Sequence, residues 1–254
     1  MTAIAAVLDS RSALAALRRS LPRGTGPVVT YRSWAGLCRG LLDRLMDAIV
    51  IGSRASRKLD LAALRTRFPG IPLVVYGAIR PEDAAQLLAW HRLGVAMVLV
   101  EGVDDAMVSD LVLRTGASTA RRAFLAQTPR QLRLTEPVQL RAWDRLVAAP
   151  GRPPRTSALA RDLGLSREHL SRQFGAGGAP NLKRVSDLLT VLSALDLLEN
   201  PGYQPAAVAR LLGFATPSHL RATVRRVAGV PFEEARGLRS GEVVKRFVRQ
   251  ELGS

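Results

Sequence analysis

Residues 156–174 read TSALARDLGLSREHLSRQF, and this stretch decides the fold of the second half of the chain. Gly164 permits a tight turn, and Ser166 is a suitable N-cap for a helix that begins directly after it. Apolar side chains on both sides of the turn have the spacing that packs two short helices together: Leu159, Leu163, Leu165 and Leu170. The stretch is therefore predicted to form a helix-turn-helix.

A second copy of this pattern follows further along the chain. We expect its first helix at residues 205–212, its turn at 213–215 and its second helix at 216–226. A helix is also predicted at 138–148, before the first copy, and a long one at 182–199 connects the two copies. The apolar surface of the long helix is wider than a single face needs, so we expect most of it to be buried between the two copies.

Particular residues of both copies carry a family resemblance. They are Ala160, 163–166, 170–172 and Phe174 in the first copy, and 208–209, 212–214 and 229–231 in the second. Over about residues 137–237 the sequence resembles the DNA-binding domain of the AraC/XylS family of transcription regulators. It departs from that family in four places: glycine-rich residues 175–178 replace a basic segment, Leu220 and Val224 replace aromatic residues, and Thr190 replaces an arginine.

The resemblance implies that the second helix of each copy enters the major groove of DNA. In the first copy Glu168, Ser171 and Arg172 are the expected base readers, with Arg172 suited to guanine and Glu168 to the amino group of cytosine. The full set of candidate DNA-binding residues is Arg167, Glu168, Ser171, Arg172, Thr216, Ser218, His219, Arg221, Arg225 and Arg226.

The second copy departs from the family at one reading position. Ala222 stands where the family often has arginine, and we expect Arg221 to compensate from a neighbouring direction. Arg225 and Arg226 lie further along the helix and are expected to contact phosphates, which fixes register without reading sequence. For any single arginine, a solvated surface charge is the simpler alternative.

The first half of the chain alternates short runs rich in valine and isoleucine with amphipathic stretches of helical length. The predicted strands are 4–8, 28–31, 48–51, 73–76 and 96–100. Ser10 and Asp60 are suitable N-caps for intervening helices, and Pro81 suits the first turn of another. Mostly apolar strands that alternate with helices indicate a parallel sheet covered on both faces. The fold class is therefore α/β followed by all-α, with a flavodoxin-like (βα)5 domain first.

Three segments of this half, 47–52, 68–75 and 94–100, look like the third, fourth and fifth strand regions of response-regulator receiver domains. That resemblance implies a phosphorylation pocket, which in the family needs an aspartate, further acidic residues for magnesium, a hydroxyl and a lysine. Here Gly52 ends the third strand, Gly77 follows the fourth, and Glu101 follows the fifth; only Asp9 remains of the acidic residues. One carboxylate is a poor magnesium site. We therefore expect a degenerate pocket that is not phosphorylated on aspartate.

Charge points to a polyanionic partner. The 254 residues carry a formal net charge of +16, and only three of the 37 cationic side chains are lysines. Arginine suits phosphates and guanine edges, although a compositional bias of the genome explains the arginine excess equally well. Double-stranded DNA is the predicted partner, with a homodimer expected and RNA polymerase as a further candidate. The single cysteine excludes an intrachain disulfide, and no cofactor or metal is expected.

The predicted domains are a receiver-like domain at 1–116, a linker at 117–136 and a double helix-turn-helix domain at 137–254. Apolar runs are too short to span a membrane and no secretory signal is evident, so we expect a cytoplasmic protein without catalytic activity. Two alternatives remain open for the first domain. It could bind a small molecule in the crevice near Asp9, Gly52 and Gly77, or it could be a flavodoxin-like enzyme.

Overall fold

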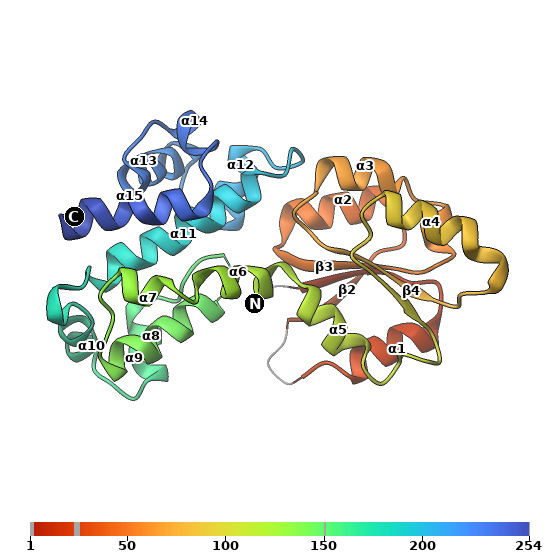
Figure 1. The fold of residues 1–254 in the computed structure, drawn as a ribbon, viewed down its shortest axis with the longest axis horizontal. Helices are drawn as coiled ribbons and strands as arrows, with labels where there is room; N and C mark the ends of the chain where they lie inside the picture. The colour runs from red at the N-terminus through yellow and green to blue at the C-terminus, as the bar shows by residue number, and fades with distance from the viewer. Residues whose placement is uncertain (1–2, 23–25, 150, 254) are drawn as a thin grey trace. The chain divides into compact units, whose positions relative to one another are not determined.

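The computed structural model describes residues 3–22, 26–149 and 151–253, so the outer limits of the predicted domains at residues 1 and 254 lie outside the described residues. Within the described part, the chain divides into two compact units (Figure 1). The first comprises residues 1–120 with 200–202, and the second comprises 121–199 with 203–254. Each unit is considered by itself.

The first unit is built on a five-stranded parallel sheet with the order β2-β1-β3-β4-β5. The strands are β1 (Ala3–Val7), β2 (Val28–Thr30), β3 (Met46–Ile51), β4 (Leu73–Gly77) and β5 (Met97–Val100). Strand pairs run in register through Ile4 and Val28, Ala5 and Ile49, Ile49 and Leu73, and Val75 and Val98. This order confirms the predicted flavodoxin-like fold.

Helices cover both faces of the sheet (Figure 1). On one face lie α1 (Arg11–Arg19) and α5 (Val108–Thr115), and on the other lie α2 (Trp34–Asp43), α3 (Leu61–Arg67) and α4 (Ala84–Arg92). Two short 3₁₀ turns, η1 (Ala55–Arg57) and η2 (Pro81–Asp83), precede α3 and α4. The N-caps predicted at Ser10 and Asp60 accept hydrogen bonds from Ala13 N (3.2 Å) and Ala63 N (2.9 Å).

Alternation along the strands places apolar side chains in two cores. Ile4, Val50 and Tyr76 face α1 and α5, where they pack with residues such as Leu17 and Val112. The intervening strand residues face the other layer of helices, because successive side chains of a strand point to opposite faces. The single cysteine, Cys38 on α2, is buried, and burial raises the pKa of its thiol, with Arg67 acting in the opposite direction.

The second unit is helical in its described part. Its helices are α6 (Ala117–Leu125), in which the division between the units falls, α7 (Thr128–Gln131), α8 (Pro137–Ala148), α9 (Thr156–Asp162), α10 (Arg167–Phe174), η3 (Ala176–Gly178), α11 (Leu182–Leu198), α12 (Pro205–Leu211), α13 (Pro217–Ala228), α14 (Phe232–Ala235) and α15 (Ser240–Leu252). The segment 117–136, predicted to be a linker, therefore contains two helices, α6 and α7.

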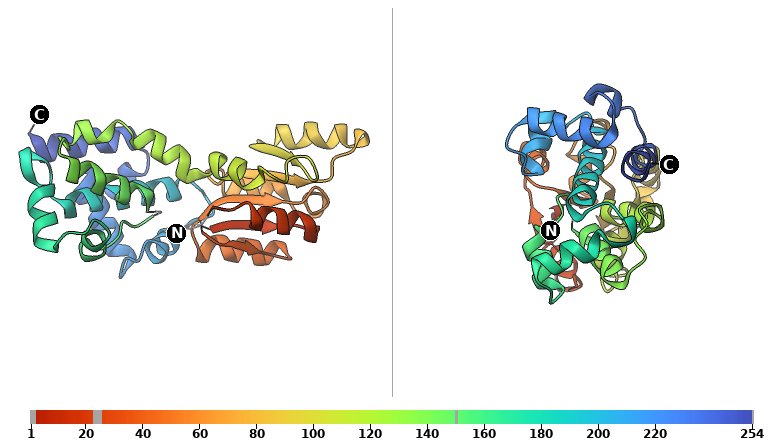
Figure 2. Two further views of the ribbon diagram at one scale, coloured as in Figure 1. Left: turned by 90° about the horizontal axis from the view of Figure 1, so that it is seen from below. Right: turned by 90° about the vertical axis from the view of Figure 1, so that its left-hand side faces the viewer.

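The long helix α11 forms the centre of this bundle (Figures 1 and 2). It contacts α8 on one side and α12, α13 and α15 on the other. Leu188, Leu189, Val191 and Leu192 are all at most 1% exposed. The connecting helix is thus buried, as predicted, against α8 and against α12 and α13 of the second helix-turn-helix copy.

Candidate nucleic-acid interface

The first helix-turn-helix consists of α9, a turn at Gly164 and α10. Gly164 has a φ of +69°, a left-handed conformation in which a side chain would be strained. Ser166 caps α10 by accepting a hydrogen bond from His169 N at 3.1 Å. Leu170 and Phe174 lie one turn apart on α10 and are fully buried. This apolar stripe fixes which side of α10 faces the protein.

The opposite side of α10 is exposed and carries the side chains that the sequence predicted as DNA contacts: Arg167, Glu168, Ser171 and Arg172. No described carboxylate forms an ion pair with Arg167 or Arg172. Because neither cation is neutralised within the protein, both are available to phosphates or guanine edges.

The second helix-turn-helix repeats this local design. Gly213, with a φ of +67°, forms the turn between α12 and α13, and its carbonyl oxygen accepts a hydrogen bond from Arg152 Nη1 at 2.6 Å. Thr216 caps α13 by accepting from His219 N at 3.1 Å, and Pro217 occupies the first turn. Leu220 and Val224 are fully buried at positions where the resembled family often has aromatic residues.

The exposed side of α13 carries the other predicted contacts: Thr216, Ser218, His219, Arg221, Arg225 and Arg226. Two of them are held by aromatic rings. The guanidinium of Arg221 lies 5.5 Å from the ring centroid of Phe232, and the ring of His219 meets that of Phe214 edge-on at 5.4 Å. These contacts restrict the side chains before any ligand arrives.

The two candidate phosphate contacts of α13 differ in their surroundings. Arg226 Nη2 lies 2.9 Å from Asp187 Oδ2 on α11, and Asp187 also accepts from Lys183 at 3.3 Å. Arg225 has no ion pair among the described residues. The positive charge of Arg226 is therefore partly compensated within the protein, whereas that of Arg225 is not.

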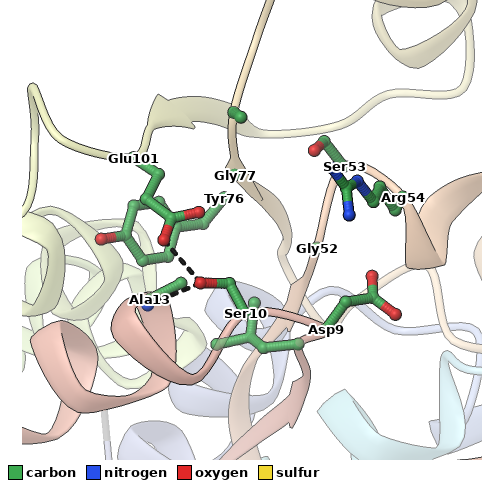
Figure 3. Close-up of a pocket in the computed structure, with 11 residues that line it drawn as sticks. Asp9, Ser10, Ala13, Gly52, Ser53, Arg54, Tyr76, Gly77 and Glu101 are labelled. Atoms are coloured by element: carbon green, nitrogen blue, oxygen red, sulfur yellow. Dashed lines mark hydrogen bonds between the residues drawn. The ribbon is translucent and has the colours of Figure 1, made fainter.

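The candidate site of the first unit lies at the carboxyl ends of its strands, at the point where the strand order reverses between β1 and β3. A cavity of about 310 Å³ there is lined by Asp9, Ser53, Arg54, Tyr76 and Glu101, among others (Figure 3). The four pocket residues predicted from the sequence, Asp9, Gly52, Gly77 and Glu101, all line it. Crevices of this kind are the usual ligand sites of open α/β sheets.

Neighbouring groups occupy the space that side chains at the two glycines would need. A Cβ on Gly52 would lie 3.1 Å from Asp9 Oδ2, and a Cβ on Gly77 would lie 2.6 Å from Ser53 Oγ and 2.9 Å from Ser53 N. The pocket is therefore built around these glycines.

Glu101 is held in place by two hydroxyl groups. Its Oε1 accepts hydrogen bonds from Ser10 Oγ and Ser12 Oγ, each at 2.5 Å, and the first of these is drawn in Figure 3. Nearby, Tyr76 donates to Asp105 Oδ1 at 2.5 Å, and burial raises the pKa of the Tyr76 phenol. This donor set does not fit magnesium, because that ion takes several oxygen ligands and Glu101 is already bonded to two serines. Among the described residues, no group of three or more His, Cys, Asp and Glu side chains is placed to hold a metal ion.

Comparison with known proteins assigns the part of the second unit that holds the two helix-turn-helix copies. A helix-turn-helix domain family matches residues 159–237, the stretch from α9 to the end of α14. The chain carries a helix-turn-helix domain of the AraC type. This domain is a DNA-binding module of transcription regulators, and it follows a receiver-like domain in this chain.

Solved structures that are similar to the chain include the following two. A transcriptional regulator from Chromobacterium violaceum, described as an AraC-type DNA-binding domain-containing protein, aligns at 23% identity over 39% of this chain and 89% of its own, with a TM-score of 0.36. Full-length FixJ from B. japonicum aligns at 13% identity over 93% of this chain and 97% of its own, with a TM-score of 0.39. No curated protein matches the sequence. None of the described helices is long and apolar enough to cross a membrane.

Sequence reasoning missed two polar residues of the second unit, one buried and one half-buried. Gln139 on α8 bonds to the end of α10, and Arg121 on α6 bonds to α11. Gln139 lies in the first turn of a predicted helix, and Arg121 lies in an arginine-rich segment. Nothing in the neighbouring sequence therefore indicated that either side chain has partners in another helix. Only the tertiary contacts distinguish them from surface residues.

Gly77→Thr, which introduces a hydroxyl at the last residue of β4, should destabilise the protein by about 1–3 kcal/mol, the usual cost of overpacking. The reason is that the new Cβ would meet the backbone nitrogen of Ser53 as well as its side chain. Thermal unfolding of the full chain measures the effect. Ala78→Thr, at the exposed neighbouring position, is the matched control and should be close to neutral. Equal stability of the two variants would show that the pocket has room for a side chain at residue 77.

Proposed function

We propose that this protein is a sequence-specific transcription regulator whose two recognition helices, α10 and α13, read neighbouring major grooves of one DNA duplex. One observation carries the proposal: each helix begins at a capped N-terminus, buries an apolar stripe and exposes arginine and small polar side chains along its other side, with Arg172 in the last turn of the short helix α10. A recognition helix that lies in the major groove contacts base edges through such an exposed side.

Each exposed residue has a proposed role. Arg172 pairs with a guanine, and Glu168 accepts a hydrogen bond from a cytosine amino group. On α13, Arg221 contacts the bases in place of the arginine that the resembled family often has at the position of Ala222. Arg225 contacts phosphates and sets the register, with Arg226 contributing once DNA competes with Asp187.

Selection of duplexes from a random pool by the full chain tests this proposal. We expect an enriched sequence with two short determinants about one helical turn apart. Affinity for that sequence should exceed affinity for unrelated DNA by at least about 10³-fold at physiological salt. Selection that enriches no sequence, with equal affinity for all duplexes, would contradict the proposal.

For the first unit, we propose a regulatory role that does not use aspartyl phosphorylation. Gly52 has no side chain, and a larger residue there would lie against the carboxylate of Asp9. Incubation of the chain with acetyl phosphate should leave its mass unchanged, because no carboxylate stands at the end of the third strand. A phosphorylated aspartate, found by mass spectrometry, would contradict this role.

We further propose that the first unit pairs with a second copy through the segment 84–112. Large apolar side chains are exposed there: Leu88 is 59% exposed, Val103 76% and Met107 54%. β5, within the same segment, is an edge strand of the sheet. Exposed apolar residues near an edge strand favour a protein contact.

Charge substitution tests this pairing. The double variant Leu88→Asp with Met107→Asp should lower the sedimentation coefficient of the full chain from that of a dimer to that of a monomer. Ala35→Asp with Ala62→Asp, at exposed positions on α2 and α3, adds the same two negative charges outside this segment and should leave the sedimentation coefficient at that of the wild type. A wild-type chain that sediments as a monomer at all concentrations would rule the dimer out.

The cavity of the first unit supports a second candidate role, the sensing of a small molecule. Its polar lining includes the carboxylate of Asp9, the hydroxyl of Ser53 and the guanidinium of Arg54. A ligand that binds only the folded state must raise the melting temperature. A screen of small polar metabolites for such shifts, repeated on Asp9→Ala, separates binding in this cavity from binding elsewhere.

A further inference from the structure

Gln139, the third residue of α8, is a polar side chain with no exposed surface. Burying an amide is costly unless its hydrogen-bonding groups are satisfied. The hydrogen-bond partners of Gln139 therefore indicate its role.

Both ends of the Gln139 amide are used. Oε1 accepts hydrogen bonds from Thr135 N at 2.8 Å and Glu136 N at 2.9 Å, which caps the start of α8. Nε2 donates to Phe174 O at 2.9 Å and to Ala176 O at 3.0 Å. One side chain thus joins the first turn of α8 to the end of α10.

The acceptors on the α10 side lie where a helix lacks partners of its own. Phe174 is the last residue of α10, and the last carbonyl groups of a helix have no intrahelical donor. Gln139 supplies the donor to Phe174 from a fixed position in the core. Because an α-helix is stiff over two turns, a fixed C-terminal end of α10 also fixes the direction of the exposed side chains in the rest of that helix.

We infer that Gln139 is a positioning residue for DNA reading: it sets the placement of α10 and thereby the aim of Arg172 and Glu168 at base edges. The inference rests on the proposed function. It adds a buried determinant of specificity that does not itself reach the DNA surface. Base readout requires this precision, because bidentate pairing with a base tolerates little displacement.

Two variants test the inference. Gln139→Met keeps the shape and removes every hydrogen bond of the amide, including a long one of 3.5 Å from Nε2 to Gln173 O. Gln139→Glu keeps an acceptor for Thr135 and Glu136 but has at most one hydrogen for the two carbonyl oxygens. The glutamate variant is isosteric and keeps the cap of α8, so it tests the contact to α10 if the methionine variant fails to fold.

The readout is the ratio of affinities for the selected duplex and for unrelated DNA. A loss of folded protein lowers both apparent affinities by the same factor and leaves their ratio unchanged. A displaced α10 lowers only the affinity for the selected duplex. We expect the ratio to fall about tenfold or more for Gln139→Met, the loss of one base contact, and by at least as much for Gln139→Glu, whose carboxylate faces the carbonyl oxygens of Phe174 and Ala176. Val191→Ala, a cavity in the middle of α11, is the control for destabilisation and should keep the wild-type ratio.

The outcomes separate this inference from the proposed function. If the wild type prefers one sequence and both Gln139 variants keep its ratio, Gln139 has only a structural role and the inference is wrong. If the wild type itself shows no preference, the proposed function fails. A fall in the ratio for Val191→Ala equal to that for Gln139→Met would also overturn the inference, since any loss of stability would then suffice.

Discussion

A chain in which Arg172 and Arg221 are both replaced by alanine should bind its selected duplex about 2–6 kcal/mol more weakly than the wild type, because each base-reading arginine contributes roughly 1–3 kcal/mol. Arg172 is exposed on α10 and has no carboxylate partner among the described residues. Arg221 is held over Phe232 on α13. Both side chains are therefore ready to pair with bases without first breaking an ion pair.

The two losses should be nearly additive, since the arginines lie on different helices and share no partner. A double variant that removes the same charge elsewhere in the second unit, Arg130→Ala with Arg249→Ala, is the matched control. Gel-shift titrations of the wild type and of the two double variants, each with the selected and an unrelated duplex, measure the six affinities that are compared. If the control loses as much affinity for the selected duplex as the test variant does, the arginines act through net charge and the base-reading roles are wrong.

Arg221→Lys adds a finer test of the aromatic contact. Lysine keeps the charge but loses the planar group that stacks on a ring and pairs bidentately with guanine. The substitution should lower affinity for the selected duplex while nearly preserving affinity for unrelated DNA. Equal affinities of Arg221→Lys and the wild type for both duplexes would show that Arg221 is a simple phosphate contact.

Much of this architecture could be predicted from local signals. The strands of the first unit are continuous apolar runs, and their alternation with helices defines a parallel sheet without knowledge of any contact. The turns at Gly164 and Gly213 need a left-handed conformation that glycine adopts most readily, so their positions mark the two helix-turn-helix copies. The caps at Ser166 and Thr216 then fix where α10 and α13 begin.

Properties that depend on distant partners could not be predicted. Arg226 and Asp187 are 39 positions apart in the sequence and lie on different helices. No pattern in either helix indicates that they form an ion pair. The segment 117–136, rich in arginine and interrupted by prolines, has the composition of a linker. Its helix α6 is held instead by tertiary contacts of Arg121 with α11. Tertiary packing overrides local composition in such cases.

Arg121 carries the second large effect that we expect, on stability. Its Nη1 donates to Ser193 Oγ, its Nη2 donates to Leu189 O at 2.7 Å, and its Nε is buried with no partner among the described residues. The carboxylate of Asp196 interacts with the Arg121 charge and accepts a hydrogen bond from Ser240 Oγ at 3.0 Å. These residues join α6, α11 and α15.

Arg121→Met and Asp196→Leu should each lower the free energy of unfolding by about 2–4 kcal/mol, because each removes one member of a largely buried pair of opposite charges. The combined variant should lose less than the sum of the two single variants, since the interaction between the two charges is removed only once. Urea denaturation followed by circular dichroism measures all three. Arg122→Met, the exposed neighbour on α6, should stay within about 0.5 kcal/mol of the wild type.

The pH dependence of Arg121→Met provides an independent check. Burial raises the pKa of Asp196, and the Arg121 charge lowers it. Without Arg121 this pKa rises further above its value in the unfolded chain, so the folded variant is favoured while Asp196 is protonated and loses stability as the pH rises through the folded-state pKa. The deficit of Arg121→Met relative to the wild type should therefore shrink towards acidic pH. A deficit that is constant with pH would show that Arg121 acts through its hydrogen bonds to Ser193 and Leu189 rather than through the charge of Asp196.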